Sequence, residues 1–188
     1  MKVLLVVDAQ NDFMPGGSLA VNEGDQIVPV INKIRGKFDK MFATRDWHPE
    51  KHCSFAQQGG PWPVHCVQNT QGSELHKELT TPDLIVDKGL DLDIDSYSAF
   101  FDNERKKATG LTEILKVFGV TELYVAGLAL DYCVKFTALD AVSEGFKTIL
   151  IEDCTRPVNV NPDDGAKALE EMKKAGITVV KSEDLLKQ

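Results

Sequence analysis

The sequence has few cysteines and no long apolar run, and each absence excludes a class of protein. The four cysteines among 188 residues lie far apart and form no Cys-x-x-Cys unit, so neither a disulfide scaffold nor a ribbon-type zinc site is indicated. The apolar run at residues 3–7 is too short for a secretory signal, and no window approaches the ~20 apolar residues of a membrane-spanning helix. We therefore expect a cytoplasmic protein that does not enter the membrane.

Basic residues are also scarce. The chain has 21 Lys and Arg against 29 Asp and Glu, a formal net charge of −8. Such a chain repels phosphate backbones and anionic membrane surfaces, and no basic stripe offsets the repulsion. Glycine-rich phosphate loops are missing as well. We therefore expect a small-molecule partner and no nucleic acid; a homo-oligomer is compatible with the sequence.

Six short apolar runs end abruptly in polar residues or glycine, as buried parallel strands do. They cover residues 3–7, 41–44, 84–86, 123–126, 148–151 and 177–180. Segments of helical spacing lie between several of them, at 28–38, 111–118 and 166–173. This alternation predicts an α/β fold with a doubly wound, mainly parallel six-stranded sheet and helices on both faces. We expect one domain over residues 1–188, interrupted by an irregular excursion at about 46–80.

Polar side chains stand at or just beyond the ends of four predicted strands. They are Asp8, Asp46, Lys88 and Cys133. Ligands of open α/β sheets bind beyond the carboxyl ends of the strands, so one crevice could hold all four side chains. Each alone would more often be a solvated loop charge or a core thiol, but four equivalent positions favour a functional site.

Cys133 is the candidate nucleophile of this crevice. A helix-compatible run follows it at residues 134–142, which places the thiol in a first helical turn. Free N–H groups and the positive end of the helix dipole favour a thiolate there, and the same N–H groups could hold an oxyanion. Asp8 can accept the thiol proton and Lys88 can orient the acid. No histidine directly follows a strand, so this set is more natural than a Cys/His pair.

Three of the four histidines fall within the irregular segment. Asp46 and His48 are two residues apart, on the same side of an extended backbone, and His52 and His65 follow. Ligation by carboxylate and imidazole fits one divalent metal, zinc, iron or manganese, with positions left open for water or substrate. The sequence therefore predicts a metal site beside the crevice. His76 has no other candidate ligand near it in the sequence, and we assign it no role.

Five ordered blocks of the chain resemble the nicotinamidases of the isochorismatase-like hydrolase superfamily. The blocks are residues 8–13 with 15–19, 44–49 with His52 and 54–55, 62–67, 88–89 with 97–100, and 127–134. The resemblance covers nearly the whole chain. It implies the isochorismatase-like hydrolase fold and an enzyme that converts nicotinamide to nicotinate and ammonia through a cysteine thioester, and that also hydrolyses pyrazinamide.

The resemblance also implies roles for individual residues. The catalytic triad would be Cys133, Asp8 and Lys88, and the metal, most commonly zinc, would be held by Asp46, His48 and His65, with His52 a ligand in some relatives. Substrate-binding positions would be Phe13, Trp62, Tyr97 and Ala129. A cis peptide between Leu128 and Ala129 would aim the N–H groups of Ala129 and Cys133 at the oxyanion. Many relatives have Thr where this chain has Leu130.

Two other functions compete with this interpretation. One keeps the fold but changes the chemistry to a carbamoyl-type amidase or to isochorismate hydrolysis, against which the metal cluster argues. The other is a non-catalytic metal or thiol protein with a structural site made by Asp46, His48, His52, Cys53, His65 and Cys66. The structural site would leave Asp8 and Lys88 without a role.

Overall fold

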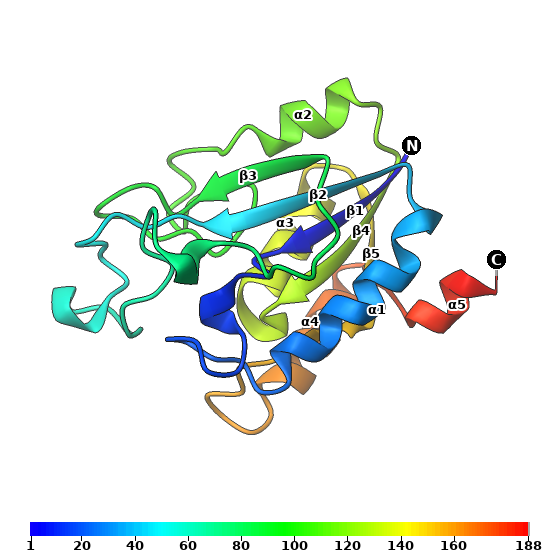
Figure 1. The fold of residues 1–188 in the computed structure, drawn as a ribbon. Helices are drawn as coiled ribbons and strands as arrows, with labels where there is room; N and C mark the ends of the chain where they lie inside the picture. Colours follow the sequence, from blue (N-terminus) through cyan, green and yellow to red (C-terminus); the bar gives the residue numbers. More distant parts are fainter. Residues whose placement is uncertain (188) are drawn as a thin grey trace.

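The computed structural model describes residues 1–187, which build one parallel sheet of six strands in the order β3-β2-β1-β4-β5-β6 (Figure 1). The strands are β1 (Lys2–Val7), β2 (Lys40–Asp46), β3 (Leu84–Lys88), β4 (Glu122–Leu128), β5 (Lys147–Arg156) and β6 (Thr178–Val180). All neighbouring strands run parallel. The predicted doubly wound sheet is confirmed, and it is parallel throughout.

Helices cover both faces of this sheet (Figure 1). One face carries α1 (Ile27–Ile34) and α5 (Ser182–Leu186), and the other carries α2 (Leu111–Val117), α3 (Lys135–Ser143) and α4 (Asp164–Lys174). The helical spacing predicted α1, α2 and α4, and the run after Cys133 predicted α3. Only α5 was not expected, because it is barely longer than one turn.

The central strand β1 explains why the sheet is covered on both sides. Leu4 and Val6 pack into the apolar cluster beneath α1, whereas Val3, Leu5 and Val7 pack into the cluster beneath α2, α3 and α4. All five side chains are fully buried. A continuous apolar run, with no polar alternation, is typical of a strand enclosed between two helical layers.

The residues predicted to be functional lie at the carboxyl edge of the sheet. Strand order reverses between β1 and β4, and this switch point is where open α/β sheets bind ligands. Between β2 and β3 the described chain has two 3₁₀ turns, Ala56–Gln58 and Gln71–Ser73, and no α-helix. No helix in the described part of the chain is long and apolar enough to cross a membrane.

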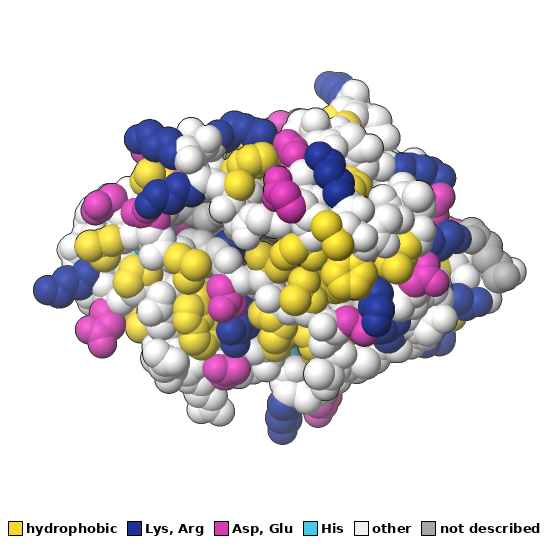
Figure 2. Space-filling view, turned by 90° about the horizontal axis from the view of Figure 1, so that it is seen from above, with side chains coloured by type: hydrophobic (Ala, Val, Ile, Leu, Met, Phe, Trp, Pro, Cys, Tyr) yellow, Lys and Arg dark blue, Asp and Glu magenta, His cyan; other side chains and the backbone are white. Residues whose placement is uncertain are grey.

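The side of the molecule that carries β3 and α2 exposes several apolar side chains. Apolar side chains spread across this side in Figure 2. Ile85 on the edge strand β3 is 40% exposed, and Val117 and Phe118 at the end of α2 are 86% and 43% exposed. This edge strand is therefore only partly protected from water.

Candidate active site

Lys88 joins the predicted catalytic residues at the centre of the site. Its Nζ lies 2.6 Å from Asp46 Oδ1, 2.9 Å from Asp8 Oδ2 and 3.4 Å from Cys133 Sγ. A fourth contact, to the carbonyl of Ser96 at 2.8 Å, completes its surroundings. Burial alone would lower the pKa of Lys88, but the two carboxylates overcome burial and raise it well above the ordinary value. Lys88 is therefore an ammonium that fixes two acids and the thiol.

Asp8 lies just beyond β1, where the backbone turns into a left-handed conformation with φ of 46°. The Thr44 hydroxyl donates to Asp8 Oδ1 at 2.6 Å, and Lys88 contacts Oδ2, so both oxygens are held. Burial raises the pKa of Asp8 to about 6, against the opposing charge of Lys88. Asp8 is thus ionised at neutral pH and still basic enough to take a proton.

Cys133 sits in a single turn of π-helix, Leu130–Val134, which continues directly into α3. Its position in a first helical turn agrees with the sequence. The sequence also predicted a thiol that ionises easily, and the structure differs on this point. Burial raises the pKa of the Cys133 thiol well above its ordinary value, and Lys88 only partly opposes this. Asp8 and Asp46 nearby also disfavour a thiolate. The thiol therefore keeps its proton at rest.

The loop before Cys133 contains the cis peptide between Leu128 and Ala129 that the resemblance implied. Ala129 and Cys133 both line the same pocket. Leu130, where many relatives have Thr, is 5% exposed and packs into the apolar cluster beneath α2 and α3. The departure at this position therefore places an apolar side chain in an apolar environment.

The predicted metal ligands Asp46, His48 and His65 come together, with ligand atoms all within 4.8 Å of one another. Asp46 Oδ2 lies 3.5 Å from His48 Nε2 and 3.9 Å from His65 Nε2. Each histidine directs its Nδ1 to a backbone carbonyl, His48 to Gly89 at 2.9 Å and His65 to Pro63 at 2.7 Å. A carbonyl only accepts, so Nδ1 carries the proton and the Nε2 lone pair is left for a metal.

The chemistry of these three donors fits a divalent metal. His48 Nε2 is buried without a hydrogen-bond partner among the described residues, an energetic cost that a metal would remove. One carboxylate and two neutral imidazoles are ligands typical of zinc, with iron and manganese also accommodated. The structural site with Cys53 and Cys66 is not assembled, since neither thiol belongs to a candidate metal group in the described chain.

His52 lies beside Asp46, His48 and His65, which we call the metal triad. Its ring stacks on that of His48, with centroids 3.9 Å apart, and its Nε2 is 3.9 Å from Asp95 Oδ1. It groups with His48 and Asp95, and not with Asp46 and His65. The structure thus places His52 near the metal triad but on its Asp95 side.

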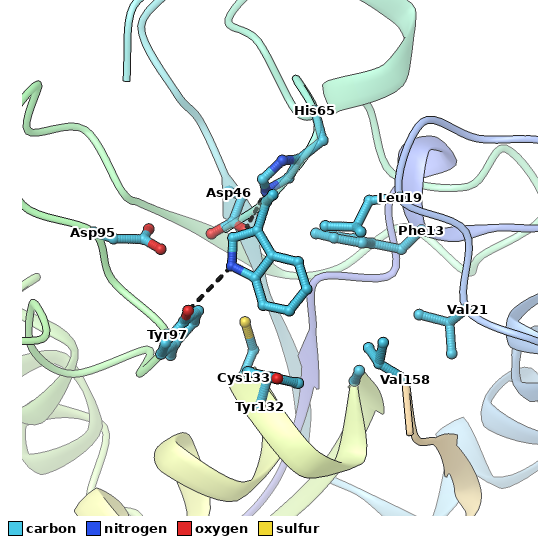
Figure 3. A pocket seen from close by; sticks show the side chains of 12 residues that line it. Phe13, Leu19, Val21, Asp46, His65, Asp95, Tyr97, Tyr132, Cys133 and Val158 are labelled. Carbon is cyan, nitrogen blue, oxygen red and sulfur yellow. Dashed lines mark hydrogen bonds and ion pairs between the residues drawn. The ribbon is translucent and has the colours of Figure 1, made fainter. Parts of the chain in front are cut away.

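A largely apolar pocket opens over Cys133. Figure 3 shows the Cys133 sulfur pointing into it, Phe13 and Val158 on one side, and Asp95 on the other. Trp62 and Tyr97 also line it, and Trp62 Nε1 donates to the Tyr97 hydroxyl at 3.1 Å. All four substrate-binding residues expected from the resemblance line this pocket: Phe13, Trp62, Tyr97 and Ala129.

Sequence reasoning missed three polar residues of the site, of which Gln10 and Thr44 are buried and Asp95 is partly buried. Gln10 donates to the Asp46 carbonyl, Thr44 donates to Asp8, and Asp95 lines the pocket. Gln10 and Thr44 lie inside the blocks that carry the resemblance, beside residues that were assigned roles. A polar residue within an apolar strand, as Thr44 is, was the available signal. Asp95 gave no such signal, because it follows two other acidic residues, Asp91 and Asp93, in the same loop.

Comparison with known proteins identifies the family. The family model of the isochorismatase domain matches residues 2–184 of the sequence. The chain belongs to the isochorismatase family. Among its relatives, a nicotinamidase of Escherichia coli is 44% identical, with 95% of this chain and 93% of the relative covered.

Two solved structures of this family are also similar to the chain. One, from L. infantum in complex with nicotinate, is 41% identical with a TM-score of 0.93, covering 97% of this chain and 93% of its own. The other, a pyrazinamidase of Pyrococcus horikoshii in complex with zinc, is 45% identical with a TM-score of 0.85, covering 96% and 98%. The similarity extends over whole chains and includes the fold.

Proposed function

We propose that this isochorismatase-family chain is a metal-dependent nicotinamidase, which hydrolyses nicotinamide to nicotinate and ammonia and also accepts pyrazinamide. One observation carries the proposal: a single pocket is lined both by the buried thiol of Cys133 and by Asp46 and His65 of the metal triad. A nucleophile for an amide carbon and a metal that would bind a ring nitrogen thus face the same pocket. The nicotinate and zinc in the two similar structures support the same chemistry.

The pocket positions the substrate before any bond changes. Phe13, Trp62 and Tyr97 offer aromatic surfaces to a flat heteroaromatic ring. A divalent metal held by Asp46, His48 and His65 would supply a Lewis acid for the ring nitrogen. The ring would then present its amide to Cys133 in a fixed orientation, which is the main advantage of binding before reaction.

Asp8 and Cys133 carry out the covalent steps. Asp8 takes the thiol proton, and the sulfur attacks the amide carbon to give a tetrahedral oxyanion, which the N–H groups of Ala129 and Cys133 stabilise. Asp8 passes the proton to the departing nitrogen, so that the C–N bond breaks, ammonia leaves and a thioester remains. Water, deprotonated by Asp8, then attacks the thioester, and nicotinate leaves as the thiol is restored.

Lys88 positions Asp8 and Cys133 relative to each other. Its ammonium contacts Asp8 and Cys133 together, which orients the acid toward the sulfur and favours the negative charge that moves between them. It also holds Asp46, which ties the catalytic acid to a metal ligand through one side chain.

The other activities of the superfamily remain the alternative. Carbamoyl-type substrates and isochorismate have no ring nitrogen for the metal triad to hold, so the assembled triad favours nicotinamide. Zinc as the resident metal, a cytoplasmic location, the absence of a nucleic-acid partner, and a homo-oligomeric state stay predictions from the sequence.

The decisive experiment measures ammonia release from nicotinamide by the metal-loaded protein. Benzamide, which has the same shape without the ring nitrogen, is the matched control substrate. We expect release from nicotinamide, much slower release from benzamide, and loss of both after chelation or thiol alkylation. No release from nicotinamide by the metal-loaded protein would refute the proposal, and equal rates on both amides would refute the role of the ring nitrogen.

A further inference from the structure

His52 and Asp95 form a pair beside the metal triad that the proposed mechanism does not use. His52 is fully buried, and its Nε2 has no hydrogen-bond partner among the described residues. The nearest charged atom recorded for it is Asp95 Oδ1, 3.9 Å away. A buried, unpaired ring nitrogen costs free energy unless it serves a ligand or a neighbouring group.

The hydrogen bonds at Nδ1 separate His52 from the two histidines of the triad. His48 and His65 both direct Nδ1 to carbonyl oxygens, which only accept. His52 Nδ1 instead receives the backbone N–H of Ser54 at 3.3 Å and lies 2.7 Å from the Ser54 hydroxyl. A backbone N–H only donates, so Nδ1 of His52 is an acceptor. Its proton then resides on Nε2, where a protonated nitrogen has no lone pair for a metal.

Asp95 is held in place from the opposite side. Its Oδ1 accepts the backbone N–H of Ser96 at 2.7 Å, and the Ser96 carbonyl accepts from Lys88 at 2.8 Å. Its carboxylate points into the pocket in Figure 3, near Asp46 and His65. The same Oδ1 is the atom that lies 3.9 Å from His52 Nε2.

The charges of the site leave a role for Asp95. Three carboxylates, Asp8, Asp46 and Asp95, lie around one ammonium, Lys88. Two negative charges are therefore left without a cation of the protein in this largely buried place. A divalent metal at the triad would balance both, and conversely both carboxylates would strengthen its binding.

We propose that Asp95 retains the metal by its charge without belonging to the ligand set, and that His52 supports Asp95 as an Nε2–H donor and is not itself a ligand. The proposal rests on the metal-dependent function proposed above and names two further positioning residues for it. It assigns three protein ligands to the metal, so that the remaining positions stay open to substrate.

The tautomer of His52 can be measured directly. Two-bond ¹H–¹⁵N correlation spectra of the zinc-loaded, ¹⁵N-histidine-labelled protein distinguish a ring nitrogen that carries a proton from one bound to zinc. We expect Nδ1–H with zinc-bound Nε2 for His48 and His65, and Nε2–H for His52. Zinc-bound Nε2 at His52 would overturn the proposal, and this readout needs no turnover and no altered protein.

Zinc affinity tests the role of Asp95. Competition with a chromophoric chelator should show a dissociation constant about 10–100-fold higher for Asp95→Asn, the loss that supporting residues around a metal commonly cause. Asp93→Asn, which removes the same charge from an exposed position in the same loop, should change it less than about 3-fold. Equal affinities of the two variants would contradict the proposal.

His52→Gln distinguishes a donor to Asp95 from a metal ligand, because the glutamine side chain keeps an N–H near the position of Nε2. We expect a loss of zinc affinity below about 10-fold for His52→Gln, against about 100-fold or more for His65→Gln. Equal losses would make His52 a ligand. Ammonia release by the unaltered protein is measured in parallel, so a failure of the nicotinamidase proposal remains distinguishable from a failure of this one.

Discussion

The side-chain amide of Gln10 pairs with the backbone of Asp46 as a neighbouring strand would. Gln10 Nε2 donates to the Asp46 carbonyl and Oε1 accepts the Asp46 N–H, both at 2.8 Å, and Nε2 also donates to the Ser73 carbonyl at 2.8 Å. Gln10 is fully buried. Since β1 has ended before this level of the sheet, the amide continues the pairing of β2 and fixes the backbone that carries Asp46.

Gln10→Ala should therefore loosen the metal site as well as the fold. We expect zinc to dissociate about 10–100-fold more readily, because Asp46 loses its backbone anchor. The buried peptide groups left unpaired should lower the free energy of unfolding by about 1–3 kcal/mol. Chelator competition and urea unfolding measure the two effects. Gln57→Ala, at an exposed position, is the control, and unchanged zinc binding by Gln10→Ala would contradict this prediction.

The rate of nicotinamide hydrolysis should depend on the ionisation of Asp8. Burial raises the pKa of Asp8 to about 6, and only the ionised carboxylate accepts the thiol proton. The value of kcat/KM should thus rise with pH and level off above about pH 6. Metal content and circular dichroism at each pH separate this effect from metal loss or unfolding. A rate that stays constant down to pH 4.5 in folded, metal-loaded protein would exclude Asp8 as the base.

Cys133→Ala should abolish turnover and leave the metal in place. Removing a covalent nucleophile lowers kcat by about 10³-fold or more. Zinc content should not change, because the thiol is not among the three residues of the triad. Cys53→Ala, which alters a partly exposed thiol, should keep activity. Substantial turnover by Cys133→Ala would assign the nucleophile elsewhere.

Lys88→Met should destabilise the fold more than most single changes. It leaves the buried carboxylates of Asp8 and Asp46 without their shared cation, and the loss of one partner from a buried charge pair costs about 3–5 kcal/mol. Lys40→Met, which breaks a surface pair with Asp83, should cost no more than about 1 kcal/mol. Urea unfolding of metal-free proteins compares the two, and equal losses would show that the Lys88 charge is not needed for stability.

Leu130→Thr tests whether Leu130 serves packing. Its buried side chain lies in the apolar cluster, where a hydroxyl and a smaller volume should cost about 1–3 kcal/mol. Leu90→Thr, at a position 54% exposed, should have little effect on unfolding. A Leu130→Thr variant as stable as the parent protein, with faster nicotinamide hydrolysis, would instead indicate a catalytic use for the hydroxyl found in relatives.

Much of this architecture could be predicted because apolar periodicity is a local property of the chain. The runs at 3–7 and 123–126 needed no distant information to be identified as buried strands, and the ends of parallel strands meet at one edge by topology. That argument alone brought Asp8 and Cys133 together. The additional two residues of β4 at its carboxyl end, up to Leu128, contain Gly127, which hides the strand from a search for β-branched runs.

The missed features depend on contacts between segments far apart in sequence. Gln10 reaches Asp46 only because the backbone turns at Asp8 with positive φ, which no pattern of residue types encodes. Asp95 resembles its acidic neighbours in the sequence and differs only in facing the pocket. The pKa of Cys133 likewise follows from burial, which the helix-start argument did not include.

The proposed metal ligands also have a consequence for the connectivity of the chain. His48 and His65 lie at the two ends of the irregular stretch 49–64, which carries Trp62 and has little regular structure. All four cysteines are free thiols, so no covalent bridge closes this stretch. A coordinated ion would do so, acting as a removable cross-link that lowers the entropy of the open loop. Metal supply would then control the shape of the substrate pocket as well as its chemistry.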